Sequence, residues 1–347
     1  MSKSSFFSSD IGIDLGTGNT LVYVRGRGIV INEPSVVTVN EKTGQVVAVG
    51  AGAKAMLGKT PPHIRAIRPL SRGVIDDFEV TQELLTYLIH KAQAGSGKLF
   101  GPRVVVGVPT GVTNVESRAV RDAALTAGAR EVYIVEEPMA GAIGAKLPVK
   151  EAVGTMVLDI GAGTTDIAVH ALGGTVSSKS SQVAGDRFNE NIIDYVRSEF
   201  SLAIGEGTAE ETKIQIGAVL PLDVELERPI RGRDLATGLP REVILTDSHV
   251  REALAPSMDA LMEAMKDVIE HTPPELLSDV LEHGVTVFGG GALVRGLPQL
   301  LSRMLGVPVH VTDEPLTAVV RGTGVITENP RAWEEVFMHE QAILPQG

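Results

Sequence analysis

The segment DIGAGTTD, from Asp159 to Asp166, places two glycines and two threonines between a pair of carboxylates. Apolar runs flank it, TMVL before and IAVHAL after, so a glycine-rich turn interrupts what reads as two strands. The pattern Asp-x-Gly-x-Gly-x-Thr occurs a second time as DLGTGNT, from Asp14 to Thr20. When residues 11–24 are placed over residues 156–169, the apolar positions around the turns also match. The chain therefore contains one strand–turn–strand device twice.

The composition of these turns suits a bound phosphate. Glycine lets the backbone bend tightly and lets N–H groups approach a ligand with no Cβ in the way, and a row of such groups forms an anion nest. Asn19, Thr20, Thr164 and Thr165 add side-chain donors. An ordinary hairpin turn is the alternative for one such segment, but two equivalent copies favour a phosphate site. Neither copy contains the G-x-x-x-x-G-K-[ST] of a P-loop.

The leading aspartates of the two turns have a different role. At neutral pH a carboxylate repels phosphate, so Asp14 and Asp159 are not expected to bind it directly. Mg²⁺ keeps several of its waters when it binds to proteins. The sequence therefore predicts that these two aspartates hold Mg²⁺ through water.

Two further segments suit the rest of a nucleotide. FGGGALVRGL, from Phe288 to Leu297, leaves its backbone open to a flat ring such as adenine, although a tight strand-to-helix connection is the alternative. AEETKIQIG offers Glu210, Glu211 and Lys213 to ribose hydroxyls, although a solvated helix face is the alternative.

Composition excludes several classes of protein. The chain has 347 residues, a length that favours two domains. Its 43% hydrophobic and 21% charged residues are typical of a globular protein. The net charge of −12 argues against a broad nucleic-acid surface. Without cysteine there are no disulfides, thiol nucleophiles or thiolate metal sites. No signal peptide or apolar run of about 20 residues is found. We expect a cytoplasmic protein, attached at most to a membrane surface.

Strands alternate with helices along the chain, which predicts an α/β fold with largely parallel pairing. One helix is expected over FEVTQELLTYLIHKAQA with Thr81 as its N-cap. The repeated turns predict two duplicated lobes around a cleft: a first lobe at 1–150 with a small subdomain near 33–66, and a second at 151–330 with one near 182–244. A tail at 331–347 is expected to pack on the first lobe.

In this order, the two turns, the GGG segment and the E-E-x-K segment resemble the superfamily of actin, sugar kinases and heat-shock chaperone ATPases. Within it the chain resembles the MreB family of bacterial actins, through IGIDLGTGNTLVY, RPLSRGVIDDF, VEEPMAGAIGA, VLDIGAGTTDIAV and GDRFNENIIDYVR. The similarity runs from about Ile11 to Gly324. It departs at Ala162, where glycine is usual, at Asp166, where glutamate is common, and at Gly18, where alanine is usual. A methyl at position 162 would crowd a phosphate that approaches closely.

The resemblance implies an actin-like ATPase fold that binds ATP or GTP with Mg²⁺. The residues it assigns to the phosphates, the ribose and the base are, in chain order, Gly16, Thr17, Gly18, Asn19, Gly161, Gly163, Thr164, Glu211, Lys213, Gly289, Gly290 and Gly291. Hydrolysis needs a water in line with the γ-phosphate, and the resemblance implies Glu137 for this task. Glu136 is the second candidate, and Thr165 is expected to help orient the same water. An acidic helix start favoured by the helix dipole is the alternative for both glutamates.

The resemblance also implies slow hydrolysis coupled to self-assembly into homopolymeric filaments, with paired protofilaments. It implies a role in rod-shape morphogenesis and cell-wall synthesis, together with cell-wall elongation membrane proteins, at the inner face of the membrane. Leu99 and Phe100 stand in a glycine-flanked loop beside Lys98 and Arg103, and the resemblance implies that this loop enters the membrane. Packing of both residues into the local core is the alternative. SSFF at residues 4–7 is a second, weaker anchor.

Two other functions on the same fold remain to be weighed. A small-molecule kinase needs a catalytic base facing an acceptor pocket and usually carries larger inserted subdomains, which we do not find. A chaperone ATPase needs a substrate-binding domain after the ATPase, whereas the sequence ends at Gly347. Assembly on addition of Mg-ATP would distinguish the filament former from both.

Overall fold

The computed structural model describes residues 10–71, 73–94 and 101–338. They form two compact units. Unit 1 comprises the described residues within Met1–Ala152, His170–Thr175 and Leu316–Gly347, and unit 2 comprises Val153–Val169 and Val176–Pro315.

Unit 1 is built on a five-stranded sheet in the order β10-β9-β1-β2-β3. Its strands are β1 (Ile11–Leu15), β2 (Asn19–Val24), β3 (Gly28–Pro34), β9 (Arg103–Val108) and β10 (Glu131–Glu136). β10, β9 and β1 are parallel, whereas β1, β2 and β3 form an antiparallel meander. The run RVVVGV is buried at all but its first position, as expected of a strand covered on both faces.

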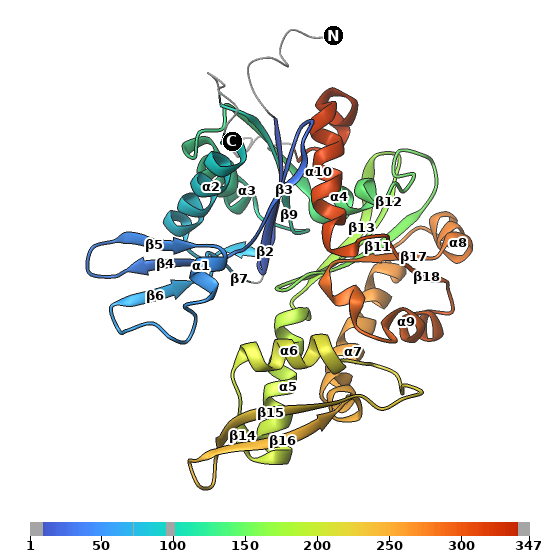
Figure 1. Ribbon diagram of the computed structural model, residues 1–347. Coiled ribbons are helices and arrows are strands. Elements are labelled where there is room, and N and C mark those ends of the chain that lie inside the picture. Colours follow the sequence, from blue (N-terminus) through green and yellow to red (C-terminus); the bar gives the residue numbers. More distant parts are fainter. Residues whose placement is uncertain (1–9, 72, 95–100, 339–347) are drawn as a thin grey trace, which may run out of the picture. The chain divides into compact units, whose positions relative to one another are not determined.

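Helices cover both faces of this sheet (Figure 1). They are α2 (Phe78–Gln93) and α3 (Asn114–Thr126) on one face, and α4 (Glu137–Gly144) and α10 (Ala318–Glu328) on the other. The N-cap of α2 is Asp77, whose carboxylate accepts the Val80 N–H at 3.1 Å. Thr81, the N-cap expected from the sequence, lies inside the helix and its hydroxyl donates to the Asp77 carbonyl at 2.7 Å.

The contact between α4 and α10 depends on glycine. A Cβ on Gly322 would overlap the Ala140 carbonyl, and a Cβ on Gly144 would overlap the Ala318 carbonyl. The two backbones therefore approach closely, which places α10 in unit 1. The sequence-based boundaries put this helix in the second lobe because it follows that lobe in the chain. The segment η4 (Pro330–Val336), in the expected tail, also belongs to unit 1.

Small elements complete unit 1. A second sheet, in the order β5-β4-β6, falls in the region near 33–66 that the sequence assigns to a subdomain. These elements are β4 (Val37–Asn40), β5 (Gln45–Val49), α1 (Ala51–Lys54), β6 (Ile64–Ile67), β7 (Leu70–Ser71) and β8 (Val74–Ile75).

Unit 2 repeats the design with a sheet in the order β13-β12-β11-β17-β18. Its strands are β11 (Thr155–Ile160), β12 (Thr165–Ala171), β13 (Gly174–Ser181), β17 (Val285–Phe288) and β18 (Val309–Val311). The turn between β12 and β13 clusters with unit 1. β11 pairs with β17 in parallel, and every residue of β11 and β12 is buried.

A smaller sheet in the order β14-β15-β16 extends unit 2 within and just beyond the expected region near 182–244. The remaining strands are β14 (Leu202–Ala203), β15 (Glu227–Asp234) and β16 (Pro240–Thr246). The helical elements are α5 (Gly185–Phe200), α6 (Glu206–Ile216), α7 (Asp247–Glu270), α8 (Pro274–His283), η2 (Gly290–Leu293), α9 (Leu297–Leu305) and η3 (Pro315–Thr317). Thr246 caps α7, because its side chain accepts the His249 N–H.

Candidate functional site

The first glycine turn closes the hairpin of β1 and β2 in unit 1. A Cβ on Gly16 would lie 2.7 Å from the Asn19 carbonyl oxygen, so only glycine fits there. The Ser35 hydroxyl donates to the Gly16 carbonyl at 2.6 Å, and its N–H donates to the Gly18 carbonyl at 3.0 Å. One neighbouring residue thus holds two carbonyls of the turn.

Two side chains that the sequence assigns to the phosphates are engaged within unit 1. The Thr17 hydroxyl accepts the Gly73 N–H at 3.2 Å. The Asn19 amide donates to Asn32 at 2.6 Å. These contacts fix the turn against its surroundings, and its glycine backbone remains the feature that suits an anion.

The candidate carboxylates of unit 1, Asp14, Glu136 and Glu137, lie at the carboxyl ends of its parallel strands, where α/β folds commonly bind ligands. Asp14 on β1 pairs in register with Gly107 on β9. Glu137, the first residue of α4, is 7% exposed, and its Cγ would lie 3.4 Å from a Cβ on Gly107. Gly107 therefore lies between Asp14 and Glu137. Burial raises the pKa of Asp14 to about 7.

The two candidate glutamates have different surroundings. Glu136, the last residue of β10, accepts a hydrogen bond from the Thr175 hydroxyl at 3.0 Å. Burial raises the pKa of Glu136, although this hydroxyl and the Gly111 N–H oppose the increase. Glu137 instead lies beside Gly107. The sequence ranked Glu137 ahead of Glu136, and these surroundings favour the same order for a task near the first turn.

The second glycine turn joins β11 to β12 in unit 2 and is held in a similar way. The Gly185 N–H donates to the Gly161 carbonyl at 3.0 Å, and the Asp186 N–H donates to the Ala162 carbonyl at 2.8 Å. Within the turn, the Gly161 N–H donates to the Thr164 carbonyl at 2.9 Å. As in unit 1, one adjacent segment holds two carbonyls of the turn.

Thr165 is fully buried at the start of β12, and its hydroxyl donates to the Val183 carbonyl at 2.6 Å. The sequence predicts that this side chain helps to orient a water. In the structure its proton is given to a backbone carbonyl, which favours a role in holding the start of the strand.

The lysine expected at the ribose lies next to the second turn. Lys213 Nζ donates to the Gly185 carbonyl at 3.0 Å and to Glu210 at 2.6 Å. Glu210 also accepts the Asn189 amide at 2.7 Å. Glu211, the sequence choice for the ribose, pairs instead with Arg228 at 2.5 Å. The sequence did not identify Asn189 as a site residue. In the segment that forms α5, only the acidic start of the helix was apparent from the sequence.

The GGG segment packs against the end of β11. Gly289 has a φ of +81°, and a Cβ there would lie 2.5 Å from Asp159 Oδ1. A Cβ on Gly291 would overlap the Ile160 side chain. Gly290 begins η2. Close packing therefore explains two of the three glycines, and it also brings this connection to the leading aspartate of the second turn.

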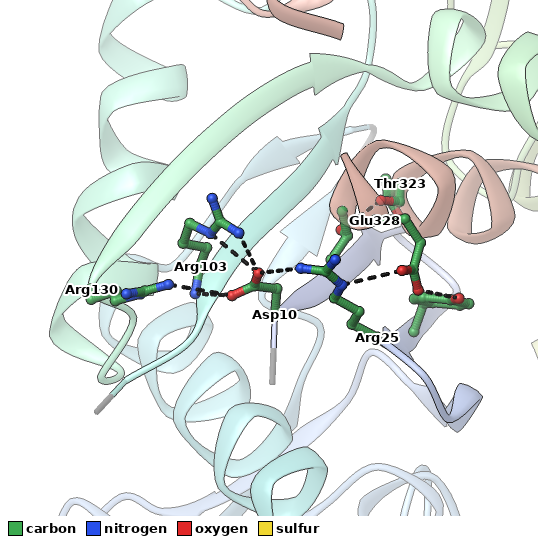
Figure 2. A network of polar contacts seen from close by, with 8 residues as sticks. Asp10, Arg25, Arg103, Arg130, Thr323 and Glu328 are labelled. Atoms are coloured by element: carbon green, nitrogen blue, oxygen red, sulfur yellow. Dashed lines mark hydrogen bonds and ion pairs between the residues drawn. The ribbon is translucent and has the colours of Figure 1, made fainter. Parts of the chain in front are cut away.

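Leu99, Phe100 and Lys98 lie outside the described residues, as does SSFF. Arg103 is described and is not free for lipid: its guanidinium donates to Asp10 at 2.6 and 3.2 Å (Figure 2). Arg25 and Arg130 approach the same carboxylate at 3.5 and 3.6 Å. Burial alone would raise the pKa of Asp10, but Arg103 and Arg130 outweigh it and hold the pKa below its usual value. The sequence also predicts that Arg103, together with Lys98, favours anionic lipid; the ion pair with Asp10 argues against that role for Arg103.

No group of three or more metal-ligating His, Asp or Glu side chains occurs among the residues that the structure describes. The aspartates fit Mg²⁺ in another way, because Asp14 and Asp159 are each the penultimate residue of a strand that leads into a glycine turn. One carboxylate beside water is a common arrangement for this ion. Over the same described ranges, no helix is long and apolar enough to cross a bilayer.

Known proteins match both the sequence and this geometry. A family model described as MreB/Mbl protein matches residues 8–335. The cell shape-determining protein MreB of Escherichia coli strain K12 is 50% identical over 337 residues, 96% of this chain and 95% of that protein. The cell shape-determining protein Mbl of Bacillus subtilis strain 168 is 48% identical over 323 residues, 93% of this chain and 97% of that protein.

The chain belongs to the MreB/Mbl family. MreB5 of Spiroplasma citri bound to ADP has a TM-score of 0.89 at 36% identity, covering 93% of this chain and 97% of that one. A MamK double helical filament has a TM-score of 0.78 at 25% identity, covering 92% and 98%. These matches confirm the predicted actin-like α/β fold, and the family relatives make this chain a homologue of cell shape-determining proteins.

Proposed function

We propose that this member of the MreB/Mbl family binds Mg-ATP, hydrolyses it slowly and assembles into homopolymeric filaments of paired protofilaments. The single observation that carries the proposal is the duplicated turn. In each unit an Asp-x-Gly-x-Gly-x-Thr segment closes a hairpin, and one adjacent segment holds two of its carbonyls. With its carbonyls held, such a turn has its remaining N–H groups to offer to an anion.

Adenine nucleotides are the ligand that the relatives support. MreB5 of Spiroplasma citri is known bound both to ADP and to AMPPNP, the latter with a TM-score of 0.89 and 36% identity to this chain. We propose that both turns contact the phosphates, through the N–H groups of Gly16, Gly18 and Gly163; Gly161 shapes the second turn, because its N–H donates to the Thr164 carbonyl. GTP is the competing nucleotide and enters the test below.

Around the sugar and the base we revise the set of residues. Lys213 and Glu210, linked at 2.6 Å, take the place next to the ribose that the sequence gave to Lys213 and Glu211. The backbone of Gly289, Gly290 and Gly291 lies under the base.

Mg²⁺ would neutralise charge that develops on the phosphates during hydrolysis. Asp14 and Asp159 would hold its waters, and ionised Asp14 would be favoured once the ion is bound. Glu137 positions the attacking water, because it lies next to Gly107 and hence to the first turn. Glu136, bonded to Thr175, has a supporting role. We expect turnover to be slow, because water is the only acceptor that the proposed site requires.

Filament formation is supported by the MamK double helical filament, which shares the fold. We propose that the filaments serve cell-shape determination and cell-wall synthesis at the inner membrane face, with cell-wall elongation membrane proteins as partners. The membrane part of this proposal rests on the sequence around Leu99 and Phe100 alone.

The test is assembly and turnover of the purified full chain. Mg-ATP should raise light scattering, pellet the protein and release phosphate, whereas ATP with EDTA should do none of these; GTP and ADP are run in parallel. Asp159→Ala should fold but release phosphate about 100-fold more slowly, because it loses metal-assisted charge stabilisation. A folded wild-type protein that neither binds ATP nor assembles would refute the proposal, and wild-type turnover in Asp159→Ala would refute the metal assignment.

A further inference from the structure

Three polar side chains outside the two glycine turns form a chain that ends at the start of α4. His170 is the penultimate residue of β12, Thr175 lies at the start of β13, and Glu136 ends β10. His170 Nδ1 lies 3.3 Å from the Thr175 hydroxyl oxygen, and that hydroxyl donates to Glu136 Oε2 at 3.0 Å. All three residues belong to unit 1. We call this chain the His170–Thr175–Glu136 relay.

His170, at the end of the relay opposite Glu136, carries a neutral imidazole at neutral pH. His170 is fully buried, and burial lowers its pKa to about 4, although the Pro138 carbonyl opposes this effect. A neutral imidazole carries one donor and one acceptor nitrogen. At neutral pH its N–H can therefore donate a hydrogen bond to the Thr175 oxygen without placing a charge in the interior.

The turn that carries the relay is fixed from outside. Leu172 and Gly173 have φ values of +53° and +77°. Their N–H groups donate to the carbonyls of Glu151 at 2.9 Å and Val149 at 2.8 Å, in the segment that follows α4. Two hydrogen bonds thus attach the β12–β13 turn to the segment that follows α4 in the chain. This attachment gives Thr175 a defined position.

The other end of the relay holds both neighbours of Glu137. Glu136 occupies the N-cap position of α4 but makes no side-chain cap bond, because its carboxylate is directed to Thr175. The Pro138 carbonyl faces the His170 ring. Glu137 lies between these two residues, so its backbone is restrained on both sides. A small displacement of a positioning group can lower a rate by orders of magnitude.

We propose that Thr175, supported by His170, is a positioning residue that aligns Glu137 for hydrolysis by holding Glu136 away from the start of α4. The proposal rests on the hydrolysis assigned above. It predicts a loss of turnover at a residue with no role in binding the nucleotide. Thr175→Val keeps the shape of the side chain and removes the hydroxyl, whereas Thr175→Ser keeps the hydroxyl.

The experiment measures ATP affinity and single-turnover phosphate release for the full chain with Mg²⁺. Thr175→Val should release phosphate about tenfold more slowly, with ATP affinity within about twofold of wild type, as expected when alignment alone is lost. Thr175→Ser should restore release to within about twofold. In a Glu137→Ala background, where release is already lowered by about 100-fold, Thr175→Val should have no further effect, because the two residues act in one path.

Several results would overturn the relay. These are wild-type release in Thr175→Val, equal losses in Thr175→Val and Thr175→Ser, or additive losses with Glu137→Ala. If Thr175→Val fails to fold, His170→Leu replaces it, since a buried apolar side chain removes the ring N–H that can donate to the Thr175 oxygen while that hydroxyl donates to Glu136. Release in a folded His170→Leu should fall about threefold with ATP affinity kept, and unchanged release would overturn the relay. Wild-type protein that binds ATP without hydrolysing it would overturn the proposed function, and the relay with it.

Discussion

At the scale of single residues, Asp14 carries an ionisable group to the end of a buried strand beside Gly107. Burial raises its pKa to about 7, from an ordinary value of 3.8. Between these values the folded state binds a proton that the unfolded state releases, so the free energy of unfolding decreases as pH rises through this window. When no cation is bound, the ionised Asp14 carboxylate therefore lowers the free energy of unfolding.

Asp14→Asn removes this penalty. Without Mg²⁺ and nucleotide, the variant should be more stable than wild type at pH 8 by on the order of 2–4 kcal/mol, and the difference should shrink toward zero as pH falls to about 4. Urea unfolding at pH 5, 6.5 and 8 measures it. A difference that does not change with pH would mean that the Asp14 carboxyl does not titrate in this window. Mg-ATP should stabilise wild type and not the variant.

Residue identity predicted the two turns but not every partner around them. The repeated Asp-x-Gly-x-Gly-x-Thr pattern could be read directly, because glycine is required by the local backbone. The sequence could not predict which of Glu210 and Glu211 pairs with Lys213, because the two are adjacent on one helix. Arg228, which is not close to them in the sequence, pairs with Glu211 and leaves Glu210 to Lys213. The sequence predicts Thr81 as the cap of α2, whereas Asp77 caps it in the structure, because both are cap-forming residues and the backbone conformation selects one.

At the scale of elements, α10 shows where chain order misleads. Its sequence AVVRGTGVITE reads as a helix, and its place after β18 suggests unit 2. The deciding feature is a pair of close backbone approaches, Gly322 to Ala140 and Gly144 to Ala318. Small residues signal such contacts only when both helices are known to face each other. The alternation of strands and helices, by contrast, follows from local periodicity and was predictable.

Gly322→Ala tests this contact, because helix propensity and packing predict opposite signs. In an open helix position, glycine to alanine stabilises by up to about 1 kcal/mol. At Gly322 the new methyl would overlap the Ala140 carbonyl, and overpacking should destabilise by about 1–3 kcal/mol or more. Gly207→Ala in α6 is the matched control, since no atom lies within 4 Å of its Cβ position. Urea midpoints that rise for both variants would show that α4 and α10 are not in close contact.

At the scale of the whole molecule, the Asp10 network fixes one edge of the unit 1 sheet (Figure 2). β1 and β9 run parallel, with Ile11 in register with Val104, so the described chain resumes at Asp10 and at Gly101 on the same edge. Arg103 joins the two strands there through Asp10, and Arg25 links the network to Glu328 at 3.1 Å. Asp10 and Gly101, the first described residues after SSFF and after Leu99–Phe100, therefore lie at the same edge of the sheet, which the sequence alone did not indicate.

This placement sharpens the membrane prediction. The Leu99 and Phe100 side chains would each contribute roughly 1.5–3 kcal/mol to membrane binding if fully buried in the bilayer. This contribution gives only weak binding for a single subunit. A filament presents many such loops, so binding should appear with assembly, through avidity. Wild-type filaments should co-sediment with anionic liposomes. Leu99→Ser/Phe100→Ser filaments should form normally and bind at least about tenfold less, since losing about 1.4 kcal/mol already costs that factor.

Controls separate insertion from the alternatives. Val224→Ser removes an exposed apolar side chain in unit 2, 74% exposed, and should leave liposome binding unchanged. Salt sensitivity should come from Lys98, because Arg103 is committed to Asp10; Lys98→Gln should reduce the preference for anionic lipid, whereas Arg103→Gln should lower the unfolding midpoint. If the Leu99/Phe100 double variant unfolds or fails to polymerise, these residues belong to the core. Equal liposome binding by the double variant and wild type would assign membrane attachment to another part of the chain.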